Sequence, residues 1–395
     1  MFNKIVMAVL FAAAFALCGA CASGSRVGAD SSVGSVNVSE TVAPKAAAKE
    51  VKGVITSFEK YGHAVLNIPI QDLLSNGFEL GDGVTVEFSN GYRLKDIPFY
   101  NGYYVKKGEP LLRAYPGHKF AAVCINYGKI NEIGGLKEGN ACTIRLTSKG
   151  RYFREQALNS LSYSDNRSDY ESDEVFANFR NVKVGDIGAG KLYRSASPID
   201  NSHSRALYAD QLVQGARISL VLNLADSRND INRYTEKDDF KSSYYIRLFD
   251  SGRVLPLSLA VDFSSSDFKT KLVDGLRKLA DMNASGPILV HCTEGKDRAG
   301  FVSALLEALM GASYEEIVGD YMLSYKNYYS ITKEKDSQKY AVIVSNNIDE
   351  MLKVIAGVSD AKNLSREGLR NGAMRYLKSG GATEEQIRKI VSMLT

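Results

Sequence analysis

One loop constrains the fold of this chain more than any other stretch: VHCTEGKDRAG, at residues 290–300. It follows a short apolar run at 287–290, which is too brief for a helix and predicts a buried strand. It leads into residues 298–310, which are apolar nearly all round and predict a central, buried helix. A strand, a loop and a buried helix in this order are typical of an α/β layer architecture, in which ligands bind at the carboxyl ends of the strands.

The loop has the chemistry of an anion site. Unpaired backbone N–H groups and the positive end of the helix dipole attract phosphate, and Gly295 lets the loop curl without a side chain in the way. Arg298 can bind two phosphate oxygens with its planar guanidinium. In such a loop the pKa of a thiol falls to roughly 3.5–7.5, so Cys292 is the candidate nucleophile that attacks phosphorus. The alternative is a buried, inert thiol in a glycine-containing turn.

The order of residues from His291 to Arg298 resembles the loop H-C-x-x-G-K-D-R-T-G of the bacterial atypical branch of the cysteine-dependent protein tyrosine phosphatases. The resemblance spans about 175–395, a domain expected to have a central sheet flanked by helices. It continues in the stretches at 178–180, 192–195, 317–321 and 376–377. It implies hydrolysis of phosphate monoesters through a phosphocysteine, with no metal and no organic cofactor. Phosphotyrosine in a protein is the expected substrate, and a phosphoinositide or inositol phosphate is the alternative.

The resemblance also implies roles for the residues around the thiol. The positions expected to surround the substrate phosphate are His291, Thr293, Glu294, Gly295, Lys296 and Ala299. Among them, His291 is expected to orient the loop and Lys296 to add positive charge beside the phosphate. Arg180, Arg194 and Asp320 match family positions and are expected to brace the loop.

Two aspartates are candidates for the general acid that protonates the leaving oxygen. Asp297 lies in the loop itself, as in the resembling branch, whereas Asp250 follows a predicted strand at 244–249. Either carboxylate could instead be structural and paired with an arginine or a lysine.

Ala299 departs from the family pattern, which has Ser or Thr at this position. That hydroxyl helps to stabilise the departing thiolate when the phosphoenzyme breaks down. Its absence predicts slow hydrolysis of the intermediate, unless another hydroxyl or a water takes over. It also leaves open a different class of protein, a phosphate-binding pseudoenzyme with weak catalysis.

The first residues predict export rather than fold. Lys4 precedes an apolar run at 5–17, which is too short to span a membrane and right for the core of a signal peptide. Small residues before Cys21 resemble a bacterial lipoprotein cleavage site, with Cys21 as the lipidated residue. We therefore expect a lipoprotein-type signal peptide at 1–20 and a flexible linker at 21–50, in a protein that is lipid-anchored in the bacterial cell envelope or secreted. The alternative is an ordinary signal peptide cut close by.

Residues 51–147 have a different pattern, in which short alternating strands and turn signals follow one another without a long helical period. They predict a small all-β, barrel-like domain. Stretches at 62–68 and 80–86 are similar to the C-terminal β-domain of the S-adenosylmethionine hydrolase/halogenase family. The likeness implies a fold and not that family's chemistry, whose nucleoside site needs a second, N-terminal domain. Cys124 and Cys142 fall in predicted strands, so a disulfide and two free thiols are both open.

Residues 148–174 are polar and predict a linker, after which strands and helices alternate. Residues 218–224 predict a strand, and capping boxes at 313–316 and 383–386 predict the starts of two helices. The small net charge of +4 over 395 residues does not predict nucleic-acid binding. The sequence has no zinc-type spacing of Cys and His, so a zinc hydrolase is not expected.

Overall fold

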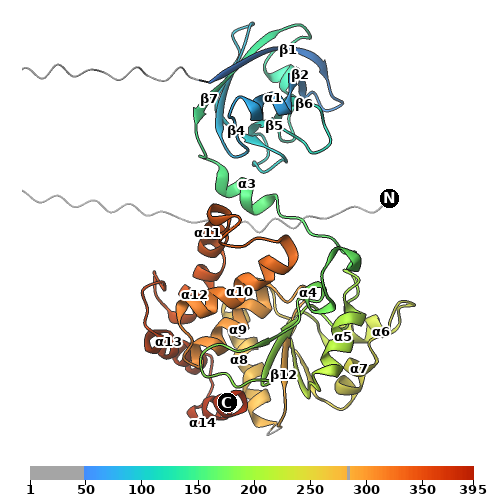
Figure 1. Ribbon diagram of the computed structural model, residues 1–395, viewed down its shortest axis with the longest axis vertical. Helices are drawn as coiled ribbons and strands as arrows, with labels where there is room; N and C mark the ends of the chain where they lie inside the picture. Colours follow the sequence, from blue (N-terminus) through green and yellow to red (C-terminus); the bar gives the residue numbers. More distant parts are fainter. Residues whose placement is uncertain (1–48, 283–284) are drawn as a thin grey trace, which may run out of the picture. The chain divides into compact units, whose positions relative to one another are not determined.

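The computed structural model describes residues 49–282 and 285–395. Within them the chain forms a closed β-barrel, from β1 to β7, and an α/β region built on a five-stranded sheet (Figure 1). This architecture confirms the fold class expected from the sequence. The predicted signal peptide at 1–20 and nearly all of the predicted linker at 21–50 lie outside the described residues.

The barrel closes in the order β1-β2-β6-β5-β4-β3-β7. Its paired strands are antiparallel except for β4 and β5, which are parallel. On β2 the side chains of Ala64, Leu66 and Ile68 are buried and alternate with more exposed ones, because successive side chains on a strand point to opposite faces. The strands are β1 (Glu50–Phe58), β2 (Ala64–Pro69), β3 (Gly83–Phe88), β4 (Arg93–Tyr100), β5 (Pro110–Arg113), β6 (Phe120–Ile125) and β7 (Ala141–Ser148), with the short helices α1 (Ile70–Ser75) and α2 (Ile130–Ile133) between them.

Two buried cysteines lie in the barrel and both carry free thiols. Cys124 is on β6 and Cys142 is on β7, strands that are not neighbours in the barrel. They also belong to different apolar clusters. Burial raises the pKa of Cys124 to about 12 and that of Cys142 to about 11. The sequence left open a disulfide or two free thiols, and the structure has the two free thiols.

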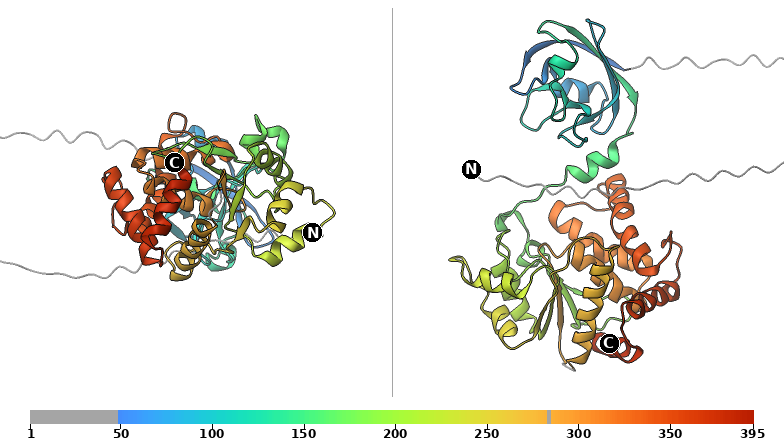
Figure 2. Two further views of the ribbon diagram at one scale, coloured as in Figure 1. Left: turned by 90° about the horizontal axis from the view of Figure 1, so that it is seen from below. Right: turned by 180° about the vertical axis from the view of Figure 1, so that it is seen from behind.

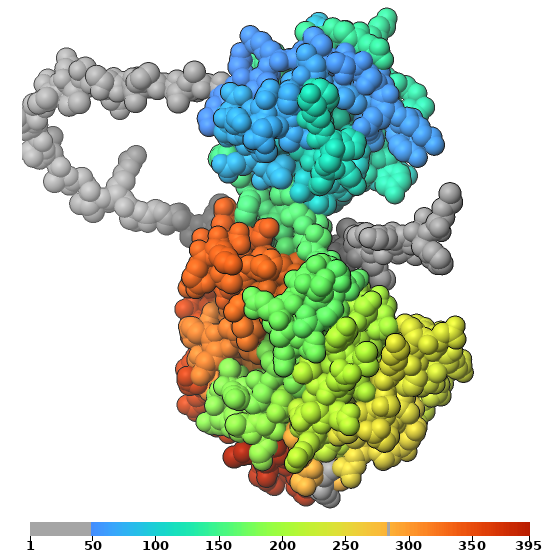
Figure 3. Space-filling model, turned by 45° about the vertical axis from the view of Figure 1, so that its right-hand side comes forward, coloured from blue at the N-terminus to red at the C-terminus, as the bar shows by residue number. Residues whose placement is uncertain are grey.

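The segment predicted as a linker is folded along much of its length. It contains α3 (Phe153–Asn159), a short 3₁₀ helix (Arg167–Asp169) and the start of α4 (Asp173–Phe176). Arg205, which is 2% exposed, donates hydrogen bonds to Asp165 at 2.6 Å and to the carbonyl of Ser164 at 2.8 Å. Figure 3 shows the end of this segment, in green, packed against the surface of the α/β region. These contacts tie residues 164–176 to that region.

The sheet of the α/β region has the order β11-β10-β12-β9-β8. β12 (Ile288–His291) lies at its centre, parallel to β10 (Leu220–Asn223) and to β9 (Leu192–Ser195). β11 (Val254–Pro256) pairs parallel with β10, and β8 (Arg180–Val182) pairs antiparallel with β9. Because β9, β10 and β12 are parallel, their carboxyl ends meet at one edge of the sheet, and the loop after β12 begins there.

Helices cover both faces of the sheet (Figure 1 and Figure 2). On one face lie α5 (Ala206–Gly215), α6 (Arg228–Thr235) and α7 (Ser243–Asp250). On the other lie α8 (Ser266–Asp281), α9 (Asp297–Leu309), α10 (Tyr314–Tyr329), α11 (Ser337–Asn346), α12 (Ile348–Ala356), α13 (Arg366–Ser379) and α14 (Glu384–Leu394). Both predicted capping boxes are present, at Ser313 and at Thr383. Within the described residues, no helix is both long and apolar enough to cross a membrane.

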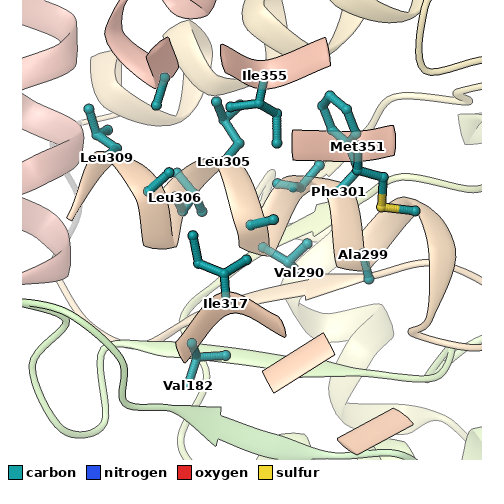
Figure 4. Close-up of a cluster of buried hydrophobic side chains, with 14 of the residues drawn as sticks. Val182, Val290, Ala299, Phe301, Leu305, Leu306, Leu309, Ile317, Met351 and Ile355 are labelled. Atoms are coloured by element: carbon teal, nitrogen blue, oxygen red, sulfur yellow. The ribbon is translucent and has the colours of Figure 1, made fainter. Parts of the chain in front are cut away.

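Helix α9 is the centre of the apolar core, as its composition predicts. Every residue from Ala299 to Leu309 is buried. Figure 4 shows Phe301 of α9 next to Met351 and Leu305 next to Ile355, with Val290 of the central strand beneath the helix. Removing a buried aromatic ring of this kind costs about 3–5 kcal/mol of stability. The loop before α9 is therefore attached to the most firmly packed strand and helix of the region.

The prediction of a strand at 244–249 is wrong, because these residues belong to α7. The aromatic and β-branched composition favoured a strand. The buried residues are nevertheless Tyr245, Leu248 and Phe249, which have the i, i+3, i+4 spacing of one helix face. The edge strand of the sheet is instead β11, which begins four residues after α7 ends.

Candidate active site

The loop at 292–296 connects the carboxyl end of β12 to the first turn of α9. Cys292 is its first residue and is 3% exposed. Asp297 is the first residue of α9 and Arg298 follows it. The thiol, the guanidinium and the unpaired N–H groups of a helix start therefore belong to one short segment, and the positive end of the helix dipole lies beside the thiol.

Gly295 is required by the shape of this loop. Its φ is +67°, a left-handed conformation that favours glycine. A Cβ atom on this residue would lie 2.3 Å from the carbonyl carbon and oxygen of Ser195, at the end of β9. The loop therefore packs directly on the backbone of the neighbouring strand.

Two arginines and one aspartate brace the loop from behind. Arg194 donates to the carbonyls of Gly295 at 2.9 Å and Lys296 at 3.1 Å, and it forms an ion pair with Asp320 at 2.7 Å. Arg180 forms a second ion pair with Asp320 at 2.8 Å. Burial would raise the pKa of Asp320, but the two arginines together hold it well below its usual range. The carboxylate is thus charged and fixes both guanidinium groups against the loop.

Arg298 is held on two sides. Its Nη1 donates to the carbonyl of Leu259, in the segment after β11, and its Nη2 donates to Oγ1 of Thr293, both at 3.1 Å. These bonds keep the guanidinium beside the loop, where it can bind phosphate oxygens. Ala299 is fully buried and brings a methyl group to the position of the family's hydroxyl.

A buried network orients His291 behind the thiol. Its Nε2 lies 3.1 Å from the hydroxyl of Tyr245, and its Nδ1 lies 3.4 Å from the carbonyl oxygen of Cys292. Asn223 donates to the hydroxyl of Tyr245 at 2.8 Å, so that hydroxyl is free to donate to Nε2. Burial lowers the pKa of His291 to about 3. The imidazole is therefore neutral at physiological pH and positions the loop rather than carrying charge.

The model of a tyrosine phosphatase family matches residues 176–395, which is more than half of the chain. The chain belongs to the tyrosine phosphatase family. A protein named tyrosine-protein phosphatase, from Nostoc commune, is 32% identical over 113 residues, covering 27% of this chain and 38% of that relative. The chain thus spans less than half the length of this relative. The family match begins after the barrel, so the likeness of the barrel to the S-adenosylmethionine hydrolase/halogenase β-domain stays a prediction.

Solved structures are also similar to parts of the chain. P. aeruginosa TpbA shares 17% sequence identity, with 52% of this chain and 88% of that chain covered and a TM-score of 0.21. An uncharacterized conserved protein from Thermotoga maritima shares 24% identity over 24% of this chain and 36% of its own, with a TM-score of 0.22. A conserved hypothetical protein from Thermus thermophilus shares 24% identity over 24% of this chain and 32% of its own, with a TM-score of 0.17.

The two aspartates considered as general acids lie in different places. Asp297 is half-buried at the start of α9, beside the loop. Asp250 is exposed at the end of α7 and precedes β11. Since β11 runs parallel to β10 and β12, the start of β11 lies at the opposite edge of the sheet from Cys292. Asp297 therefore lies at the end of the loop that begins with Cys292, whereas Asp250 lies at the other edge of the sheet.

Asp226 is a carboxyl near the site that the sequence analysis missed. It follows β10 at the same edge of the sheet as Cys292, is 5% exposed and accepts a hydrogen bond from Asn223 at 3.0 Å. Burial raises the pKa of Asp226 above its usual value, and nearby Arg298 opposes that rise. The sequence did contain a signal for Asp226, because it is a polar residue shortly after a buried strand. Such residues lie at the carboxyl edge of the sheet, where ligands bind.

Lys296 does not carry a free charge, because its side chain is paired within the protein. Its ammonium lies 3.0 Å from a carboxylate oxygen of Glu294 and donates to the hydroxyl of Tyr329 at 3.0 Å. Tyr163, from the segment predicted as a linker, donates to the other carboxylate oxygen of Glu294. Nothing in the pattern of residues 148–174 indicated this contact, because it depends on how that segment folds back along the chain.

Proposed function

We propose that this protein hydrolyses phosphate monoesters through a phosphocysteine at Cys292. The observation that carries the proposal is the shared location of the thiol, the guanidinium of Arg298 and the start of α9. The helix dipole and the positive guanidinium favour a bound phosphate beside the nucleophile. Membership of the tyrosine phosphatase family supports phosphoric monoester hydrolysis as the activity.

In the first step the thiolate of Cys292 attacks phosphorus, the bond between phosphorus and the ester oxygen breaks, and that oxygen takes a proton from a general acid. In the second step a water attacks the phosphocysteine and loses a proton, the sulfur–phosphorus bond breaks, and inorganic phosphate leaves with the thiolate restored. Arg298 and the backbone N–H groups of the loop bind the phosphate oxygens in both steps.

We assign the general acid to Asp297, because it starts α9 directly beside the loop and is open to solvent on one side. Asp226 is the second candidate, favoured by its burial at the same edge of the sheet. A general acid must be protonated at the working pH, and the raised pKa of Asp226 favours its protonated form.

Phosphotyrosine in a protein is the proposed substrate. Tyrosine rings line the flank of the loop. The ring centres of Tyr163 and Tyr328 lie 4.8 Å apart. Aromatic side chains of this kind attract another aromatic ring. A phosphoinositide or inositol phosphate is the alternative substrate.

The decisive experiment compares the wild type with Cys292→Ser. Turnover of p-nitrophenyl phosphate should be measurable in the wild type, inhibited by vanadate and abolished in the variant, while the variant still binds vanadate. Rapid quenching of the wild type in detergent at alkaline pH should trap one phosphoryl group on Cys292, and more of it than in Ala299→Ser, which restores the hydroxyl of the family loop. Near-normal turnover by Cys292→Ser would exclude the mechanism. Vanadate binding without turnover in the wild type would instead favour the pseudoenzyme.

We further propose that the protein is exported and lipid-anchored through Cys21, on the evidence of the sequence alone. Expressed in a bacterial host, the mature protein should partition into detergent, and Cys21→Ala should lose this behaviour. Equal partitioning of the two forms would exclude lipidation and leave secretion as the remaining form of export.

A further inference from the structure

The side chain of Glu294, and not only its backbone, is held in place. One carboxylate oxygen accepts a hydrogen bond from Tyr163, and the other lies 3.0 Å from Nζ of Lys296. Burial would raise the pKa of Glu294, but Lys296 and the Tyr163 hydroxyl lower it below its usual value. The side chain is therefore a carboxylate at neutral pH, two residues from the thiol.

Lys296 is enclosed by this carboxylate and by aromatic rings. Its Nζ lies 5.6 Å from the ring centre of Tyr325 and 5.3 Å from that of Tyr329, and the residue is 9% exposed. The carboxylate of Asp297 lies 3.9 Å away on a further side. Ion pairs and cation–π contacts thus hold the ammonium in a fixed, largely neutralised position.

The outer wall of this arrangement is Tyr163, and it is firmly anchored. Its ring packs against Tyr328 at 4.8 Å and Tyr329 at 5.7 Å, measured between ring centres. The guanidinium of Arg205 lies 5.0 Å from the same ring and also bonds the adjoining residues of the segment. Tyr328 in turn donates to the backbone carbonyl of Glu294 at 2.6 Å.

We propose that Glu294 determines specificity by holding Lys296 and Tyr163 along one flank of the loop, so that the site selects aryl phosphates with a single phosphate group and rejects polyphosphorylated substrates. The inference rests on the proposed function, because it concerns the substrate of the same loop.

The physical reason lies in the charge on that flank. A phosphate group carries about −1.5 to −2 at neutral pH, so a ligand with several phosphates needs cations beside the one bound by the loop. Lys296 is a cation of the loop itself on this side, and its charge is already balanced by Glu294. A second phosphate would have to displace the carboxylate or lie next to it. An aromatic ring meets no such repulsion and can pack against the tyrosines.

The experiment uses the full chain and the variant Glu294→Gln, which keeps the shape of the side chain and removes its charge. The substrates are a phosphotyrosine peptide, inositol 1-phosphate and inositol hexakisphosphate. We expect kcat/KM for the hexakisphosphate, relative to that for the peptide, to rise on the order of tenfold, which is about 1.4 kcal/mol. The ratio for inositol 1-phosphate should not rise, since that ring has no additional phosphates.

Two further variants separate the local effect from general ones. Glu294→Gln combined with Lys296→Gln should lose the gain, because the gain comes from the freed ammonium. Glu367→Gln removes the same charge from an exposed position at the start of α13 and should leave all three ratios unchanged. Circular dichroism and thermal melting establish that each variant is folded, and Glu294→Ala replaces Glu294→Gln if the latter does not fold.

Binding measurements keep this inference separate from the proposed catalysis. In a Cys292→Ser background, calorimetric affinities for the peptide and the hexakisphosphate should show the same tenfold change on Glu294→Gln, whether or not the wild type turns over. If the wild type shows no turnover but Glu294→Gln still changes the affinities in this way, the proposed function is excluded and the specificity role of Glu294 is retained. The role of Glu294 would be overturned if the Cys292→Ser protein bound the two ligands with equal affinity. It would also be overturned if Glu294→Gln changed the ratio of the two affinities by less than about twofold.

Discussion

Gly295 allows the most direct quantitative prediction, because its environment is made of backbone atoms. The change is Gly295→Ala. The residue has a φ of +67°, which costs an alanine about 1–2 kcal/mol relative to glycine. The new methyl group would also lie 2.3 Å from two atoms of Ser195 and 2.7 Å from the N of Ala196, whereas an ordinary contact begins at 3.4 Å. Since neither partner is a movable side chain, the loop itself must shift by about 1 Å to relieve the contact.

A shift of about 1 Å in a reacting group can lower the rate by about 100-fold, equivalent to about 2.7 kcal/mol of transition-state stabilisation. We therefore expect kcat/KM for p-nitrophenyl phosphate to fall at least 100-fold in Gly295→Ala, with a lower melting temperature. Steady-state kinetics and differential scanning calorimetry measure the two quantities.

Gly319→Ala is the matched control. Gly319 is exposed in the interior of α10, and a Cβ atom there would meet nothing within 4 Å. Alanine is the better helix former by about 1 kcal/mol, so this variant should be slightly more stable and equally active. If Gly295→Ala keeps its activity within a few-fold of the wild type and melts at the same temperature, the loop does not depend on glycine at this position and the reasoning is refuted.

Three further predictions concern protons. The pKa of the buried His291 is about 3, far below its unfolded value, so its contribution to stability is complete above pH 6.5 and is lost as the pH falls. Between pH 7 and pH 4 the free energy of unfolding, measured with denaturant, should fall by about 3 kcal/mol more in the wild type than in His291→Asn. Equal falls in the two proteins would contradict this prediction. Asp297→Asn should slow phosphotyrosine far more than p-nitrophenyl phosphate, with a loss of about 10²–10⁴-fold for the poorer leaving group, and should remove the basic limb of the pH–rate profile. If Asp226→Asn shows that dependence and Asp297→Asn does not, the acid is Asp226. Iodoacetamide at neutral pH should alkylate Cys292 in the native protein and should alkylate Cys124 and Cys142 only after unfolding, because burial raises the pKa of both barrel thiols. Mass spectrometry of peptides measures this, and alkylated Cys124 or Cys142 in the native protein would contradict it.

The sequence by itself determined the features that depend on neighbouring residues. The loop from Cys292 to Arg298 is one continuous stretch, so its thiol, glycine and guanidinium are brought together by the covalent chain and by the strand and helix on either side. Apolar alternation in the barrel and the apolar helix α9 are likewise local patterns, because burial of a strand face or of a whole helix is recorded in residue periodicity. These features predicted the fold class and the candidate nucleophile.

Only the tertiary structure decided which residues from elsewhere reach that loop. Asp250 was a reasonable candidate until α7 and the parallel pairing of β11 placed it at the far edge of the sheet. Asp226 and Tyr163 approach the loop from segments 66 and 129 residues before Cys292, and no local pattern records such a contact. The reason is physical: the ends of parallel strands and the path of an anchored segment are set by packing of the whole region, while residue patterns report only the environment of each element.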